Sequence, residues 1–92
     1  MSVTIEIPKA LQTYTKGAVI IKVDHCQSVC DCINALIKQF PALDGQILDN
    51  EEMLLLRWSI YINNQILSER GGLSSSVKTD DVITLLPMIS GG

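Results

Sequence analysis

Apolar and polar residues alternate at the start of the chain. Val3, Ile5 and Ile7 fall on one face of an extended segment, and Thr4 and Glu6 fall on the other. A period of two in β-branched residues predicts a half-buried strand.

The same alternation returns in residues 18–23, where Val19, Ile21 and Val23 share one face. Residues 9–16 have no such period and are predicted to form a loop. Two adjacent strands joined by a short loop favour an antiparallel hairpin.

The period changes after the second strand. Ser28 is a favourable N-cap residue, and Asp31, three positions later, provides a variant of the capping box. The apolar residues that follow have the spacing of one face of an amphipathic helix: Val29, Ile33, Leu36, Ile37 and Phe40. Because Pro41 ends this pattern, we predict a helix over residues 29–39 that lays its apolar face on the sheet.

The pattern is ambiguous across residues 42–57. Leu43, Ile47 and Leu48 are compatible with a short helical turn. Residues 53–56 form a continuous apolar run, which is either a buried strand or a packed loop. The sequence does not decide between these alternatives.

Alternation resumes in residues 58–62, which predict another strand. Asn63-Asn64 is a tight-turn dipeptide, because Asn tolerates positive φ, and residues 65–67 follow as a short return strand. Residues 82–86 predict the last strand. Ile83 and Leu85 are expected on one face of it, and the three other residues on the opposite face: Val82, Thr84 and Leu86.

The order of elements is strand, strand, helix, irregular segment, strand, short strand, strand. One main helix packed on a mixed sheet of four or five strands is an α+β arrangement. Two hairpin-like ends with a helix between them predict the β-grasp, or ubiquitin-like, topology. We expect one β-grasp domain over residues 1–86 and a flexible C-terminal tail over residues 87–92.

Composition supports a folded domain and narrows the function. The chain has 92 residues, enough for one small domain, and 47% of them are hydrophobic, which argues against disorder. Its formal net charge is −3, so it lacks the basic surface that binds nucleic acid. No apolar run approaches the ~20 residues of a membrane span, and residues 1–8 lack the features of a secretory signal. A cytoplasmic protein with no membrane partner is expected.

Four potential metal ligands lie close together in the sequence: His25, Cys26, Cys30 and Cys32. Cys30 and Cys32 are two residues apart on the predicted helix and therefore point to nearly opposite faces. None of the cysteines forms a Cys-x-x-Cys pair, so no metal site is predicted. Three cysteines within seven residues are no disulfide framework either, and we expect them to pack as small apolar side chains.

The chain ends at Gly91-Gly92, after a predicted β-grasp domain. In this combination it resembles the ThiS/MoaD family of ubiquitin-like sulfur carrier proteins, and most closely the branch that serves cysteine biosynthesis. The similarity rests on residues 3–8, 60–64, 71–73, 81–87 and 91–92. Asn64 and Asp80 stand where the family commonly has Gly, and both residue types tolerate left-handed backbone geometry.

The resemblance implies chemistry at the Gly92 carboxylate. In this family a partner, an E1-like enzyme, uses ATP and Mg²⁺ to adenylate the terminal carboxylate, which sulfur then converts to a thiocarboxylate. The chain itself has no phosphate-cradling loop; it would bind no cofactor and would be a substrate and not an enzyme. Gly91 and Gly92, which lack Cβ atoms, would enter the partner's narrow channel at the end of a tail that reaches about 20 Å from Leu86. The rest of the partner-binding tail is Pro87, Met88, Ile89 and Ser90.

Docking requires a surface as well as a tail. The residues expected to form an apolar docking patch are Tyr61, Val82, Thr84 and Leu86. The same face is also compatible with ordinary half-buried sheet surface, or with pairing of two copies.

Three functions remain open from the sequence. The first is a sulfur carrier, whose acceptor is best matched by a pyridoxal-phosphate cysteine synthase; molybdopterin, thiazole, homocysteine and thiolated tRNA synthesis are the alternatives. The second is a ubiquitin-like modifier conjugated through Gly92. The third is a β-grasp binding module in which the terminal glycines are incidental.

Overall fold

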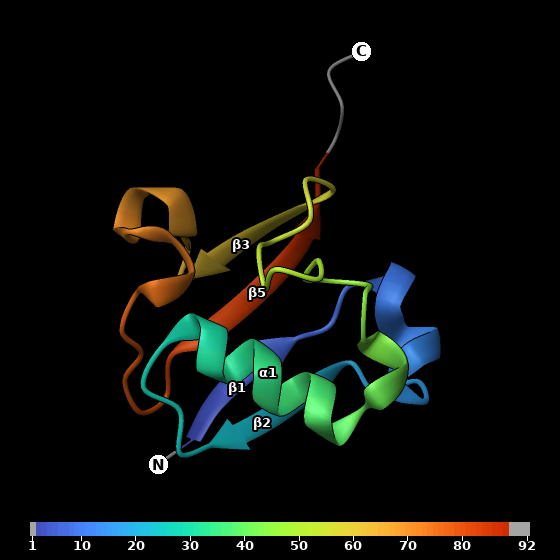
Figure 1. Ribbon diagram of the computed structural model, residues 1–92. Helices are drawn as coiled ribbons and strands as arrows, with labels where there is room; N and C mark the ends of the chain where they lie inside the picture. Colours follow the sequence, from blue (N-terminus) through green and yellow to red (C-terminus); the bar gives the residue numbers. More distant parts are fainter. Residues whose placement is uncertain (1, 89–92) are drawn as a thin grey trace.

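The computed structural model describes residues 2–88, which form a five-stranded sheet with one α-helix (Figure 1). The strands are β1 (Ser2–Glu6), β2 (Ile20–Asp24), β3 (Trp58–Ile62), β4 (Gln65–Ile66) and β5 (Val82–Pro87), and the helix is α1 (Val29–Gln39). Four short 3₁₀ helices complete the fold: η1 (Lys9–Thr15), η2 (Pro41–Leu43), η3 (Leu67–Arg70) and η4 (Gly72–Ser74).

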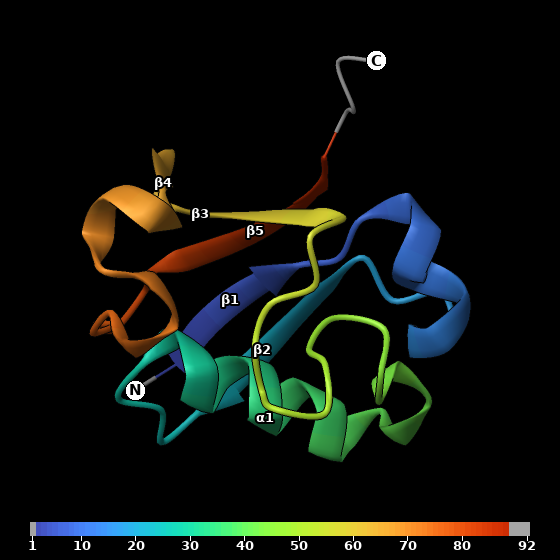
Figure 2. The same ribbon diagram turned by 45° about the horizontal axis from the view of Figure 1, so that its top comes forward.

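The strand order is β2-β1-β5-β3-β4. Two antiparallel hairpins, β1–β2 and β3–β4, flank β5, which runs parallel to β1 and antiparallel to β3. The helix lies across one face of this sheet (Figure 2). The α+β architecture, with one main helix on a mixed sheet, is therefore confirmed.

The helix begins and ends where the pattern predicted. The Ser28 hydroxyl accepts the N–H of Asp31, and the Asp31 carboxylate accepts the N–H of Ser28, so the capping box is complete. This arrangement satisfies backbone donors that a helix start otherwise leaves unpaired. The apolar face, with Ile33 and Leu36 fully buried, then packs on the sheet.

The inward positions of the central strands alternate as predicted. β1 buries Val3 and Ile5, β5 buries Ile83 and Leu85, and β3 buries every second residue from Trp58. The residues between them face the opposite side of the sheet.

Two features near the N-terminus differ from the prediction. Residues 9–15, expected as a loop, form η1, which buries Leu11 and Thr15. The Thr15 hydroxyl lies 2.9 Å from the carbonyl oxygen of Ala18, a local contact that an apolar period does not reveal. β2 begins only at Ile20, and Val19, expected to share a face with Ile21 and Val23, is 55% exposed whereas those two are buried.

The pattern left residues 42–57 undecided; residues 42–43 belong to the short helix η2, and residues 44–57 form a packed loop. Ile47 and Leu48 are buried, and a single β-bridge joins Leu48 to Leu54. The indole N–H of Trp58 donates to the carbonyl of Gln46 at 2.7 Å, which ties this loop to the start of β3.

The turns have the predicted geometry. Asn63 and Asn64 both have positive φ, at 49° and 74°, as a two-residue hairpin turn requires. Asp80 also has positive φ, at 70°, so a left-handed residue without glycine is accommodated before the last strand.

Candidate functional site

The reactive end predicted from the sequence lies mostly beyond the described residues. Ile89, Ser90, Gly91 and Gly92 fall outside residues 2–88, and nothing is stated of their structure. Pro87 and Met88 are described, and they form the root of the tail.

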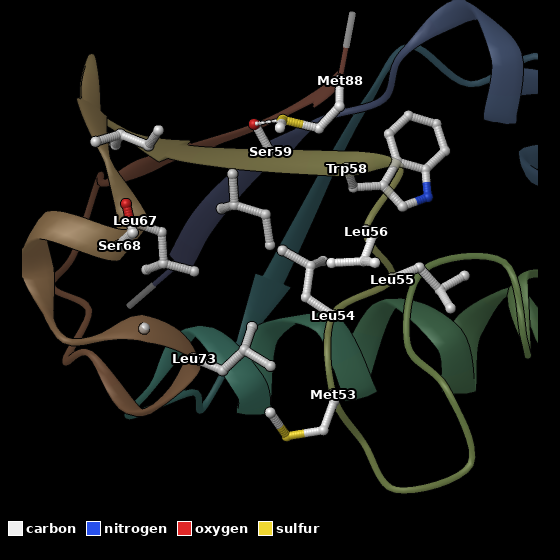
Figure 3. Close-up of a pocket in the computed structure, with 13 residues that line it drawn as sticks. Met53, Leu54, Leu55, Leu56, Trp58, Ser59, Leu67, Ser68, Leu73 and Met88 are labelled. Carbon is white, nitrogen blue, oxygen red and sulfur yellow. Dashed lines mark hydrogen bonds between the residues drawn. The ribbon is translucent and has the colours of Figure 1, made fainter. Parts of the chain in front are cut away.

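The root of the tail remains attached to the sheet. β5 extends one residue beyond the predicted Leu86, because Pro87 pairs with Trp58 at the end of the ladder, where its missing N–H is tolerated. The N–H of Met88 then donates to the carbonyl of Arg57 at 2.7 Å. The Met88 sulfur lies 2.6 Å from the Ser59 hydroxyl, so this side chain lies back over β3 (Figure 3).

A buried polar cluster anchors the opposite end of β5. The Asp81 carboxylate is 8% exposed and accepts the Lys78 N–H and the Asn63 amide, both at 2.8 Å. The Asn63 side-chain oxygen accepts the N–H of Val82 at 2.9 Å. The start of β5 is therefore fixed to the β3–β4 turn through side chains as well as through the ladder.

The four predicted docking residues lie together. Val82, Thr84 and Leu86 alternate with the buried side chains of β5, and Tyr61 on β3 is the register partner of Thr84. Leu86 is 44% exposed, and the other three are half-buried. They occupy the face of the sheet opposite α1, which we call the open face (Figure 2).

The open face also includes residues that the apolar pattern of the sequence does not single out. Glu6 on β1 pairs in register with both Ile20 and Thr84, and the Thr84 hydroxyl donates to the Glu6 carboxylate at 2.6 Å. Ile66 stands opposite Tyr61 at the other side. The alternation in residues 3–7 placed Glu6 on this face, but only the parallel β1–β5 register brings it to Thr84.

The cysteines show no arrangement for metal binding or nucleophilic chemistry. Cys26 and Cys32 are buried, and Cys30 is half-buried. Burial, followed by the charges of Glu52 and Asp31, raises the pKa of the Cys30 thiol, and burial beside Cys26 raises the pKa of Cys32. Raised values keep both thiols protonated at neutral pH, and a thiol is a weaker nucleophile than a thiolate.

Among residues 2–88, no group of three or more His, Cys, Asp or Glu side chains lies close enough to hold a metal ion. Within the same range, no helix has the length and apolar character needed to cross a membrane.

Comparison with known proteins places this geometry in a family. The family model described as "ThiS family" matches residues 5–92, including the terminal glycines. Sulfur carrier protein CysO of Mycobacterium tuberculosis, and the protein of the same name from Mycobacterium bovis, are 27% identical over 94 residues that cover 100% of both chains.

Solved structures agree with this assignment. A chain in the BexX/CysO complex of Amycolatopsis orientalis superposes with a TM-score of 0.86 at 28% identity, covering 98% of this chain and 99% of that one. Small archaeal modifier protein 1 (SAMP1) of Methanosarcina acetivorans superposes with a TM-score of 0.85 at 25% identity, covering 99% of this chain and 96% of that one. The resemblance inferred from the sequence is thus confirmed: this chain belongs to the ThiS family and has its ubiquitin-like β-grasp fold.

Proposed function

We propose that this protein is a sulfur carrier that acts through the carboxylate of Gly92. The observation that carries the proposal is the family match, which runs from β1 to the last residue of the chain. The full-length similarity to proteins named sulfur carrier protein CysO supports the same function, in cysteine biosynthesis or the synthesis of a related sulfur-containing metabolite.

The proposed chemistry has two steps. An oxygen of the Gly92 carboxylate attacks the α-phosphorus of ATP, pyrophosphate leaves, and an acyl adenylate forms. Hydrosulfide then attacks the acyl carbon, the bond to AMP breaks, and loss of the sulfur's proton leaves the terminus as a thiocarboxylate. The carboxylate is ionised at neutral pH, because α-carboxyl groups titrate near ~3.5, so it needs this activation.

ATP and Mg²⁺ would be bound by the E1-like enzyme, since the carrier provides the carboxylate and its own backbone. The tail beyond Met88 has four residues, which reach at most about 13 Å when extended. This is less than the span measured from Leu86, because Pro87 and Met88 are held by β3. The folded domain must therefore dock close to the partner's active site.

The open face is the proposed docking surface for that approach. It presents Leu86 beside the root of the tail and Tyr61 farther along the sheet, opposite Thr84, and a partly exposed apolar patch of this kind is typical of a protein interface. The complex of a related CysO with BexX supports assembly with a partner enzyme. A sulfur-accepting enzyme, such as a pyridoxal-phosphate cysteine synthase, would use the same tail at a later step.

Conjugation to proteins is the second candidate function. The structural similarity to SAMP1, a modifier protein by name, favours it. Both functions share the adenylate, and they differ in whether sulfur or a lysine amine displaces AMP.

The first test is reconstitution with the E1-like enzyme of the same organism. Wild-type chain should support ATP–pyrophosphate exchange, and a variant with one alanine added after Gly92 should not, because the added residue displaces the carboxylate. A matched control carries Val19→Ala, an exposed change on the β2 side of the sheet, two strands from β5, and should retain full exchange. Equal exchange by the extended variant would refute the role of Gly92.

A further inference from the structure

An apolar groove lies beside β3, on the helix side of the sheet (Figure 3). Its volume is about 410 Å³, and the 53–56 segment forms one wall while η3 and η4 form the other. The side chains that define it are Leu54, Leu55, Leu56, Ile60, Leu67 and Leu73. Leu56 is 94% exposed and Met53 is 59% exposed, so much of this apolar surface faces solvent.

The groove borders a free strand edge. β5 pairs with β3 along its whole length, whereas β4 pairs only with Tyr61 and Ile62 on the other side. Residues 58–60 therefore have no strand neighbour on that edge within the described chain. The same three residues line the groove.

Two backbone groups on this edge have no hydrogen-bond partner within residues 2–88, and the residues that carry them are themselves nearly buried, Trp58 at 6% and Ile60 at 1% exposed. The N–H of Met88 donates to the carbonyl of Arg57, and the N–H of Asn63 donates to the carbonyl of Val82. The odd-numbered residues on the β3 side therefore form the hydrogen-bonded pairs with β5. Since bonded pairs alternate in an antiparallel ladder, the C=O of Trp58 and the N–H of Ile60 point away from β5. Within residues 2–88 neither group has a recorded partner. The carbonyl of Trp58 and the N–H of Ile60 therefore lie on either side of Ser59. One residue of an added strand could donate to the first group and accept from the second.

The other free edge of the sheet is protected differently. β2 carries Lys22 and Asp24, both exposed, and charged residues on an edge strand discourage pairing with another chain. Residues 58–60 carry no charge, and they line a groove whose walls are mostly apolar side chains.

The charges around the groove select the occupant further. Glu51 and Glu52 precede one wall, and Glu69 and Arg70 follow Ser68 on the other. The three glutamates are exposed, whereas Arg70 is half-buried and its guanidinium donates to the carbonyl oxygen of Ser76. Arg57 lies at the opposite end, near Met88. A segment with basic residues at the end near Met53 is therefore favoured electrostatically.

We propose that this groove binds an extended segment of a partner protein, apolar at alternate positions and basic at one end, which adds a strand to the free edge of β3. Main-chain hydrogen bonds to Trp58 and Ile60 would supply affinity, and the groove would accept every second side chain. The proposal does not depend on the fate of Gly92.

The test is a titration of the ¹⁵N-labelled full chain with a synthetic peptide of two lysines followed by alternating valine and threonine. Chemical-shift changes should be confined to residues 53–60 and 67–73, and the Ile60 amide should become protected from hydrogen exchange. The same peptide, N-methylated at alternate nitrogens, should bind about tenfold more weakly because it loses strand hydrogen bonds.

A matched pair of variants distinguishes binding in the groove from non-specific binding of the peptide to the protein surface. Leu56→Lys should weaken peptide binding by about tenfold, through lost apolar contact and repulsion of lysine. Val19→Lys introduces the same charge on the opposite edge of the sheet, at a residue 55% exposed, and should have no effect. Because both positions are exposed, both variants are expected to fold.

Three results would overturn the proposal: no binding, shift changes along β2 instead of β3, or equal binding by the Leu56→Lys variant. Concentration-dependent dimerisation through β3 without peptide would show that a second copy is the occupant, and it would also overturn the proposal. ATP–pyrophosphate exchange on the same samples reports the function of the tail separately.

Discussion

The two ends of β5 are held in different ways. At the start of the strand, the buried Asp81 carboxylate receives hydrogen bonds from Asn63 and from the Lys78 backbone. At the end, the ladder to β3 continues through Pro87, and a backbone hydrogen bond joins Met88 to Arg57, with no buried side-chain anchor like Asp81 among the described residues there. The comparison teaches that one strand can serve two purposes: it is anchored by side chains where it begins, and under the proposed function it would present the terminal carboxylate beyond its last residue.

Among changes at the two ends of β5, Asp81→Ala should have the largest effect, and that effect should be on stability. The substitution leaves the Lys78 N–H and the Asn63 amide without their acceptor, and we expect a loss of about 2 kcal/mol in the free energy of unfolding. Urea denaturation measures this loss, and Asp80→Gly is the matched control, because glycine accepts the positive φ there. At a temperature where both variants are folded, ATP–pyrophosphate exchange should be unchanged; a proportional loss of exchange would mean that the anchored end also contacts the enzyme.

Leu86→Asp should have the opposite effect to Asp81→Ala: it should lower activation by the partner enzyme and leave stability nearly unchanged. Leu86 is 44% exposed on the open face, so its replacement should change the free energy of unfolding little. The kcat/KM for activation by the E1-like enzyme should fall by about tenfold, because an apolar contact is lost and a charge is desolvated at the interface. The control is Val19→Asp, outside the patch. Unchanged kcat/KM for Leu86→Asp would exclude the open face as the docking surface.

The smallest effect concerns sulfur chemistry within the folded domain. The pKa of the Cys30 thiol is raised, chiefly by burial, so its thiolate fraction at neutral pH is below that of a free cysteine. Its alkylation by iodoacetamide should be several-fold slower than that of a cysteine peptide at pH 7 and should increase with pH above 9. A thiocarboxylate, as the anion of a stronger acid, should be alkylated readily at pH 7. Mass mapping distinguishes the two sites, and fast reaction of Cys30 at pH 7 would contradict the burial argument.

Much of the fold followed from local pattern. Ser28 and Asp31 define the start of α1 because the capping box involves neighbours in sequence, and the alternation in residues 58–62 and 82–86 defines which side chains are buried. The predicted docking residues could be grouped for the same reason, since alternation places Val82, Thr84 and Leu86 on one face.

Other features depend on contacts between distant segments. The loop before β3 has no regular period, so its bridge from Leu48 to Leu54 and the exposure of Leu56 could not be read from the sequence. The contact between Glu6 and Thr84 joins residues 78 positions apart and needs the parallel register of β1 and β5. The free edge of β3 exists because β4 ends after two residues, which the predicted three-residue return strand did not convey.

The most direct test of the sulfur carrier function is the intact mass of the full chain, isolated gently and without reductant from its native cells. We predict a species in which one sulfur has replaced one oxygen, absent from a variant that lacks Gly91 and Gly92. Only the unmodified mass, in cells shown to contain the active E1-like enzyme, would contradict the proposed function. Recovery of most of the chain attached to larger proteins would instead establish the modifier function.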